Sequence, residues 1–284
     1  MKTNLRNSPD QDLVQVLLDR LPELAVLVME DRPENANFRR NPDDPREHFT
    51  NWHQFGIVTH THKVVEVYKS EAWDYLSSWG IAGDVEHALS PMIDGVAKVE
   101  LLGISLPLHD LGKFARDIKY VGDSWLPDFD DHEAKSERLI LAEGPVRDLL
   151  RAGGLSEDQI RYVARCAGLH FELGQMRYEA RHSAAGYTLA FASSERCRLA
   201  CRRIALKFPE FAPEIGVLFL CDSLAKTDIV IEVRTDGEIE AHTEWIKAEI
   251  QERGLDPRLI AAVKQRAVNI AVARKYLEMV FPGQ

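Results

Sequence analysis

Apolar residues recur at helical spacing along most of the chain, and this pattern limits the fold more than any other feature. An early example places six of them on one helical face: Leu13, Val14, Leu17, Leu18, Leu21 and Leu24. The same spacing predicts further helices at about 51–78, 83–90, 95–108, 132–152, 156–170, 186–207, 212–229, 237–253 and 256–280. Only residues 229–233 are β-like, and they fit either one short strand or a helix end. We therefore expect an all-α fold.

Breaks in the helical pattern suggest how the chain is organised. Residues 8–11, Ser-Pro-Asp-Gln, have the form of a capping box at the start of the first helix. Residues 31–50 are polar and contain three prolines, which predicts a connection lying over the surface of the core. Residues 118–131 and 171–182 are expected to be loops. We expect an N-terminal helix and connection at 1–50, a central domain at 51–235 and C-terminal helices at 236–284, packed together as one compact domain.

Composition narrows the function classes. The 284 residues are 45% hydrophobic and 28% charged, which is typical of a soluble globular protein. No apolar stretch reaches the roughly 18 residues of a membrane span, and the N-terminus has no signal-peptide pattern, so a cytoplasmic location is expected. The net charge of -10 makes duplex nucleic acid an unfavourable partner. Small phosphorylated substrates stay open, because bound metal ions can supply local positive charge.

The dipeptide His109-Asp110, at the end of the apolar segment 95–108, is the first candidate for metal binding. Two adjacent side chains of a helix point about 100° apart, so they share an ion only in a particular geometry. His132 opens a predicted helix and His170 ends another. Asp222 lies within a strongly apolar helix, where a carboxylate is costly unless a cation pairs with it. That cation is either a metal ion or a neighbouring base such as Lys226, and the two readings have equal weight.

A further candidate histidine lies in the segment around residue 60. We prefer His60, for its threonine and valine neighbours, although His62 in the same turn is a rival and His53 lies two helical turns earlier. His48, His87 and His242 have polar neighbours and are expected to be solvated.

Taken in order, these residues resemble the HD superfamily of metal-dependent phosphohydrolases, in the subset with two additional histidines. The resemblance covers about residues 55–230, and the run His109-Asp110-Leu111-Gly112-Lys113 carries it most closely. It implies an HD-domain helical bundle, here with additional N- and C-terminal helices. It also implies that one metal ion binds His60, His109, Asp110 and Asp222, and that a second binds His132 and His170 with Asp110 bridging. Such a ligand set suits two divalent transition-metal ions, namely Fe, Mn, Zn, Co or Ni.

The reaction expected from this resemblance is hydrolysis of a phosphoester, either a nucleotide or a small phosphomonoester or diester, by a metal-activated water. Asp110 and Lys113 would be the catalytic residues, with Lys113 also reaching the bound phosphate. Arg177, Arg181 and His182, which follow His170 closely, are candidates for substrate binding because arginine grips phosphate with two N–H groups.

Two other functions stay open at this point. The same six ligands resemble those of HD-fold oxygenases, in which a mixed-valent di-iron pair cleaves a C–C or C–P bond. A helical signalling or ligand-binding domain with little activity is the third reading, although the presence of all six ligand types argues against it.

Overall fold

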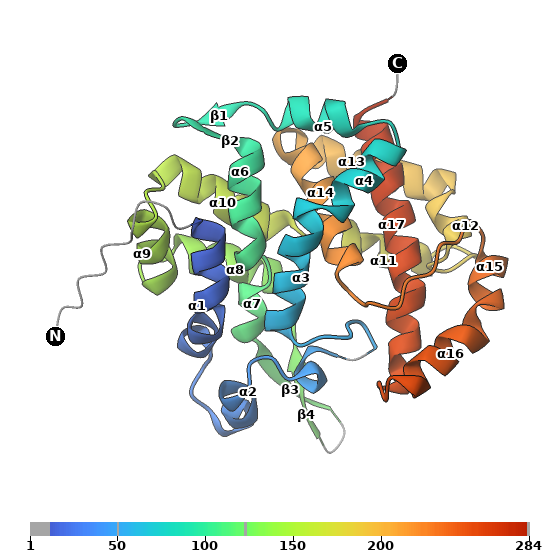
Figure 1. The fold of residues 1–284 in the computed structure, drawn as a ribbon, viewed down its shortest axis with the longest axis horizontal. Coiled ribbons are helices and arrows are strands. Elements are labelled where there is room, and N and C mark those ends of the chain that lie inside the picture. The colour runs from blue at the N-terminus through green and yellow to red at the C-terminus, as the bar shows by residue number, and fades with distance from the viewer. Residues whose placement is uncertain (1–11, 50, 122–123, 283–284) are drawn as a thin grey trace.

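The structure is a computed structural model that describes residues 12–49, 51–121 and 124–282, and it is all-α (Figure 1). Up to residue 114, the described helices are α1 (Leu13–Val28), α2 (Ala36–Arg40), α3 (Ile57–Lys69), α4 (Glu71–Ser78), α5 (Ala82–Ala88), α6 (Lys98–Ser105) and α7 (Leu111–Phe114). Those that follow are α8 (His132–Leu141), α9 (Pro145–Ala152), α10 (Glu157–Leu169), α11 (Met176–Arg181), α12 (Leu189–Ala192), α13 (Glu195–Lys207), α14 (Ala212–Leu224), α15 (Asp236–Ala241), α16 (Thr243–Glu252) and α17 (Ile260–Val280).

Short 3-10 helices and two small hairpins join these helices. The 3-10 helices are η1 (Pro33–Asn35), η2 (Pro45–His48), η3 (Leu106–Leu108), η4 (Glu172–Gln175), η5 (Pro209–Phe211) and η6 (Pro257–Leu259). The antiparallel hairpins pair β1 (Met92–Ile93) with β2 (Val96–Ala97), and β3 (Asp117–Val121) with β4 (Ser124–Asp128).

Helix α14 lies in the interior and packs against α3, α10 and α17 (Figure 1). Almost every one of its side chains is buried, as expected of a helix that is apolar all round. The main apolar core draws on α1, on the central helices and on the end of α17, so the predicted terminal segments share a core with the middle of the chain. A second, smaller core joins α15, α16, η6 and the first half of α17.

Several predicted boundaries differ from the structure. Residues 118–131, expected as a loop, contain most of the β3–β4 hairpin, and residues 171–182 contain η4 and α11. Residues 229–233 form neither a strand nor a helix; Ile229 and Ile231 instead point into the second core, which explains their β-like alternation. The predicted helix 132–152 is divided between α8 and α9, where Gly144 has a φ of 154°. The capping box expected at 8–11 lies outside the described residues; Asp12 caps α1.

The predicted connection, described over residues 31–49, lies against the core, as expected, and is held there by polar contacts. Arg116 donates to Asn35 and forms a 2.6 Å ion pair with Glu47. The Asp43 carboxylate accepts hydrogen bonds from the backbone and the hydroxyl of Thr59, at the start of α3. These contacts bring η2 against the end of α3 that carries the first candidate ligand. Among the described residues, no helix has both the length and the apolar character to cross a membrane.

Candidate metal centre

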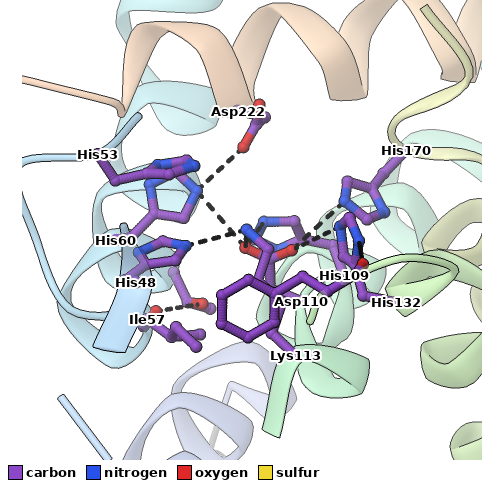
Figure 2. A network of polar contacts seen from close by, with 12 residues as sticks. His48, His53, Ile57, His60, His109, Asp110, Lys113, His132, His170 and Asp222 are labelled. Carbon is purple, nitrogen blue, oxygen red and sulfur yellow. Dashed lines mark hydrogen bonds and ion pairs between the residues drawn. The ribbon is translucent and has the colours of Figure 1, made fainter. Parts of the chain in front are cut away.

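Six predicted ligands converge from five parts of the fold (Figure 2). They are His60 on α3, His109 and Asp110 between η3 and α7, His132 at the first position of α8, His170 just after α10, and Asp222 in the last turn of α14. All six side chains are buried, with residue exposures from 0 to 8%.

A break in the helix allows His109 and Asp110 to face the same centre. Pro107 lies in η3, where α6 gives way to a tighter turn because proline has no N–H for a helical hydrogen bond. Asp110 then has φ -101° and ψ 11°, outside regular helix geometry, before α7 begins. The two side chains therefore do not diverge as they would on one continuous helix.

The candidate ligand atoms form two groups that share Asp110. Within each group, all atoms lie within 4.8 Å of one another: His60, His109, Asp110 and Asp222 in the first, and Asp110, His132 and His170 in the second. Oδ1 of Asp110 lies 3.4 Å from the Nε2 atoms of both His132 and His170. Its Oδ2 lies 3.3 Å from His109 Nε2 and 3.7 Å from His60 Nε2. These residues could hold a metal ion, and the two groups are those expected from the sequence.

Backbone carbonyls orient all four histidines in the same way. Nδ1 of His109 donates to Leu106 at 2.6 Å, that of His132 to Phe129 at 2.8 Å, and that of His170 to Ala167 at 2.7 Å. His60 Nδ1 lies 3.3 Å from the carbonyl of Ala225. Because a carbonyl can only accept, Nδ1 of His109, His132 and His170 carries the proton and Nε2 presents its lone pair to the centre. Nε2 of His60 also faces the centre, 3.0 Å from Oδ1 of Asp222. This arrangement is typical of metal-binding histidines.

Unpaired buried atoms support the same reading. His109 Nε2 and Asp110 Oδ1 are buried and have no hydrogen-bond partner, and Asp222 Oδ2 has only an ion pair with Lys226. Leaving such atoms unpaired costs about 1–3 kcal/mol each. All three are atoms that would coordinate metal, so the donor set fits divalent transition-metal ions.

Two lysines are paired with the two carboxylates. Lys113 donates to Asp110 Oδ2 at 2.7 Å, and Lys226 Nζ lies 3.3 Å from Asp222 Oδ2. Burial would raise the pKa of Asp110, but its interactions with His109 and Lys113 hold that pKa well below its usual range. Burial lowers the pKa of Lys226 to about 8, against the opposing charge of Asp222. The structure thus contains the Asp222–Lys226 ion pair and also places Asp222 among the candidate metal ligands.

His48 and His53 form a wall beside this centre, with stacked rings 4.0 Å apart. His48 donates from Nδ1 to the carbonyl of Phe55, and its Nε2 accepts from Lys113 at 2.9 Å (Figure 2). His53 Nε2 lies 3.4 Å from Lys226 Nζ. The expectation of a solvated His48 is wrong: the residue is 1% exposed, and burial lowers the pKa of its imidazole well below the usual value. His87 is exposed, as expected.

The other predicted residues have different outcomes. His60 is buried at the centre whereas its rival His62 is exposed. The Arg177 guanidinium lies 4.1 Å from the ring centre of Trp52, the residue before His53. Arg181 and His182 are both exposed, and within the described part of the chain neither contacts a candidate ligand.

Close packing of α7 on α8 fixes the spacing between the two groups. A Cβ on Gly112 would lie 2.0 Å from the carbonyl oxygen of His132, so only glycine allows this approach. The Gly112 N–H donates to Ser136 Oγ, which in turn donates to the carbonyl of His109. Ser136 therefore joins the His109 side of the centre to α8.

No protein-family model, curated protein or solved structure matches this chain. The function proposed below therefore rests on the geometry of the site.

Proposed function

We propose that this protein is a metal-dependent phosphohydrolase in which a metal-activated water attacks a phosphoester. The observation that carries the proposal is the shared carboxylate: Asp110 belongs to both groups of candidate ligands, which suits two neighbouring ions. When bound, two such ions lower the pKa of a water and polarise the phosphoryl oxygens.

The chain's own residues supply the rest of the chemistry. Lys113, buried and 2.7 Å from Asp110, carries a fixed positive charge beside the position where phosphate would bind. Such a charge stabilises the negative charge that develops on phosphoryl oxygens. Glu133 lies beside His132, its Oε2 3.4 Å from Nδ1, and burial raises the pKa of its carboxyl group. Glu133 is thus placed to help orient the imidazole of the candidate ligand His132.

The test is hydrolysis by protein loaded in turn with Mn, Co, Ni and Fe, measured on a panel of phosphomonoesters and phosphodiesters. Asp110→Asn should reduce turnover at least about 1000-fold, since it removes the carboxylate shared by both ions. Asp84→Asn, on an exposed helix position, is the matched control and should retain full turnover. Full turnover of Asp110→Asn would refute the proposal.

One observation favours a second candidate, an oxygenase that uses a mixed-valent di-iron pair to cleave a C–C or C–P bond. All six ligands and the flanking His48 and His53 are enclosed, and exclusion of water protects reactive intermediates from side reactions. The discriminating experiment is metal analysis after aerobic purification together with measurement of oxygen consumption. Full turnover with a redox-inert metal eliminates the oxygenase.

A further inference from the structure

Once metal ions bind, the carboxylates of the candidate centre cannot also neutralise all of the positive side chains around it. Lys113 and Lys226 are 6% and 1% exposed, and each is paired with a carboxylate that is itself a candidate ligand. Metal ions held by Asp110 and Asp222 would draw on the negative charge that these lysines now share. Both ammonium groups would then remain buried without a full counter-charge, which is strongly unfavourable.

The histidine wall does not supply the missing negative charge. His48 and His53 approach the lysines through Nε2 at 2.9 and 3.4 Å, so they orient the ammonium groups as neutral acceptors. A bound anion would supply this negative charge.

Arg177 adds a third cation with free donors. Its Nη2 donates to Gln265, but its Nε and Nη1 are buried and have no hydrogen-bond partner. Three rings line the guanidinium: those of Trp52, Phe171 and Tyr187, at 4.1, 5.7 and 5.7 Å. Burial lowers the pKa of Arg177, and its interactions with Tyr187 and Asp222 act against this. A half-buried arginine whose Nε and Nη1 groups are buried and unpartnered matches the fork geometry of an oxyanion.

Arg177 contacts two residues that are adjacent in sequence to histidines of the centre or its wall. Trp52, against which Arg177 stacks, directly precedes His53, which contacts Lys226. Phe171, on its other side, directly follows the candidate ligand His170. The Phe171 ring also lies 6.0 and 6.2 Å from the rings of His132 and His170, so Arg177 stands at the edge of the centre, beside residues that flank its ligands.

We propose that the substrate is a small organic phosphate with a second anionic group, and that Arg177 and Lys226 bind this second group while the metal ions and Lys113 hold the phosphoryl group. This inference rests on the proposed function, whose metal-bound phosphoryl group it takes as the first anchor. The second group is an oxyanion, either a carboxylate or another phosphate.

The test is calorimetric binding of three non-hydrolysable probes to the metal-loaded, full-length protein. Propylphosphonate has one anionic group, 3-phosphonopropionate adds a carboxylate, and 1,3-propanediphosphonate adds a second phosphonate. At least one of the two-group probes should bind about tenfold or more tightly than propylphosphonate, the gain expected of hydrogen bonds to a charged group. The tighter of the two identifies the kind of second group. Equal affinity for all three probes overturns the inference.

Variants on α11 locate the second group. Arg177→Met should remove the advantage of the two-group probe while leaving propylphosphonate affinity and metal content unchanged. Arg177→Lys keeps the charge but not the fork and should retain part of the advantage. Arg181→Met is the matched control, because this arginine is exposed four residues further along the same helix, and it should bind all probes like the wild type. An undiminished advantage in Arg177→Met overturns the assignment.

The two proposals fail in different ways. Tighter binding of a two-group probe without hydrolysis of any phosphoester refutes the hydrolase and supports the anion site. Hydrolysis with equal affinity for all probes supports the hydrolase and refutes the anion site.

Discussion

Gly112→Ala tests whether the packing of α7 on α8 sets the spacing of the metal centre. The new Cβ would lie 2.0 Å from the carbonyl oxygen of His132, 2.7 Å from the backbone nitrogen of Ser136 and 2.8 Å from Lys135 Cβ. Two of these atoms belong to the backbone, so no side-chain rotation relieves the clash. Since ordinary contact begins at 3.4 Å, the start of α8 must move by 3.4 − 2.0 = 1.4 Å.

This displacement carries His132 away from Asp110. Metal–ligand distances tolerate only about ±0.2 Å, so we expect the second ion to be lost while the first, which does not use α8, is retained. Overpacking of this kind costs about 1–3 kcal/mol, which for a chain of this size lowers the melting temperature by roughly 2–12 °C.

The assays are metal stoichiometry by mass spectrometry and unfolding by calorimetry. Gly103→Ala is the control, because its Cβ would meet only Tyr68 Cε1, at 3.4 Å. It should bind metal like the wild type and melt at the same or a slightly higher temperature. A Gly112→Ala protein with wild-type metal content and stability would refute the reasoning.

Three further predictions concern metal binding and pH. Asp222→Asn should lower the affinity of the first ion only, whereas Asp110→Asn should lower the affinity of both; equal metal titrations for the two variants would contradict a shared carboxylate. Removal of metal by a chelator should lower the free energy of unfolding, which denaturant titration measures. The loss should be about 2.7 kcal/mol per site, compared with protein in free metal at 100 times the dissociation constant. Burial raises the pKa of Glu133 above 4.5, so in metal-free protein its favourable contribution is present below that pH and is lost as pH rises through the folded-state value. Glu133→Gln should therefore unfold at a higher denaturant concentration than wild type at pH 7. Near pH 3, about the limit where Glu133 is protonated in both the folded and the unfolded protein, the two should unfold at the same concentration. An equal midpoint at pH 7 would contradict the burial of this carboxyl group.

The helical class was predictable from the sequence because it depends on local signals, whereas the convergence of six residues was predicted from the resemblance of their order to a known family. Helical periodicity marks α3, α10 and α14, and a carboxylate such as Asp222 in an apolar helix indicates a buried counter-charge. The order of the histidines then suggested which residues meet, and the structure brings them together in two groups.

Other parts depend on contacts between distant segments and have no local signal. His48 reaches Lys113, 65 residues away in sequence, and its polar neighbours suggested only a solvated side chain. From the sequence, Arg177, Arg181 and His182 were equal candidates for substrate binding. Folding buries much of Arg177 and leaves the other two exposed. The helix breaks between α3 and α4 and between α8 and α9 likewise depend on turns that the apolar spacing does not reveal.

The stacked His48–His53 pair has a consequence for the strength of every charge in the centre. Both rings are uncharged at neutral pH, because burial lowers each pKa well below its usual value, and they occupy space that water would otherwise fill. A wall of neutral rings keeps the local dielectric constant low, and the attraction between unit charges rises as that constant falls. His48 and His53 thus reduce the screening of charges in the centre. A few fixed charges can then attract a bound anion with a force that open solvent would largely cancel.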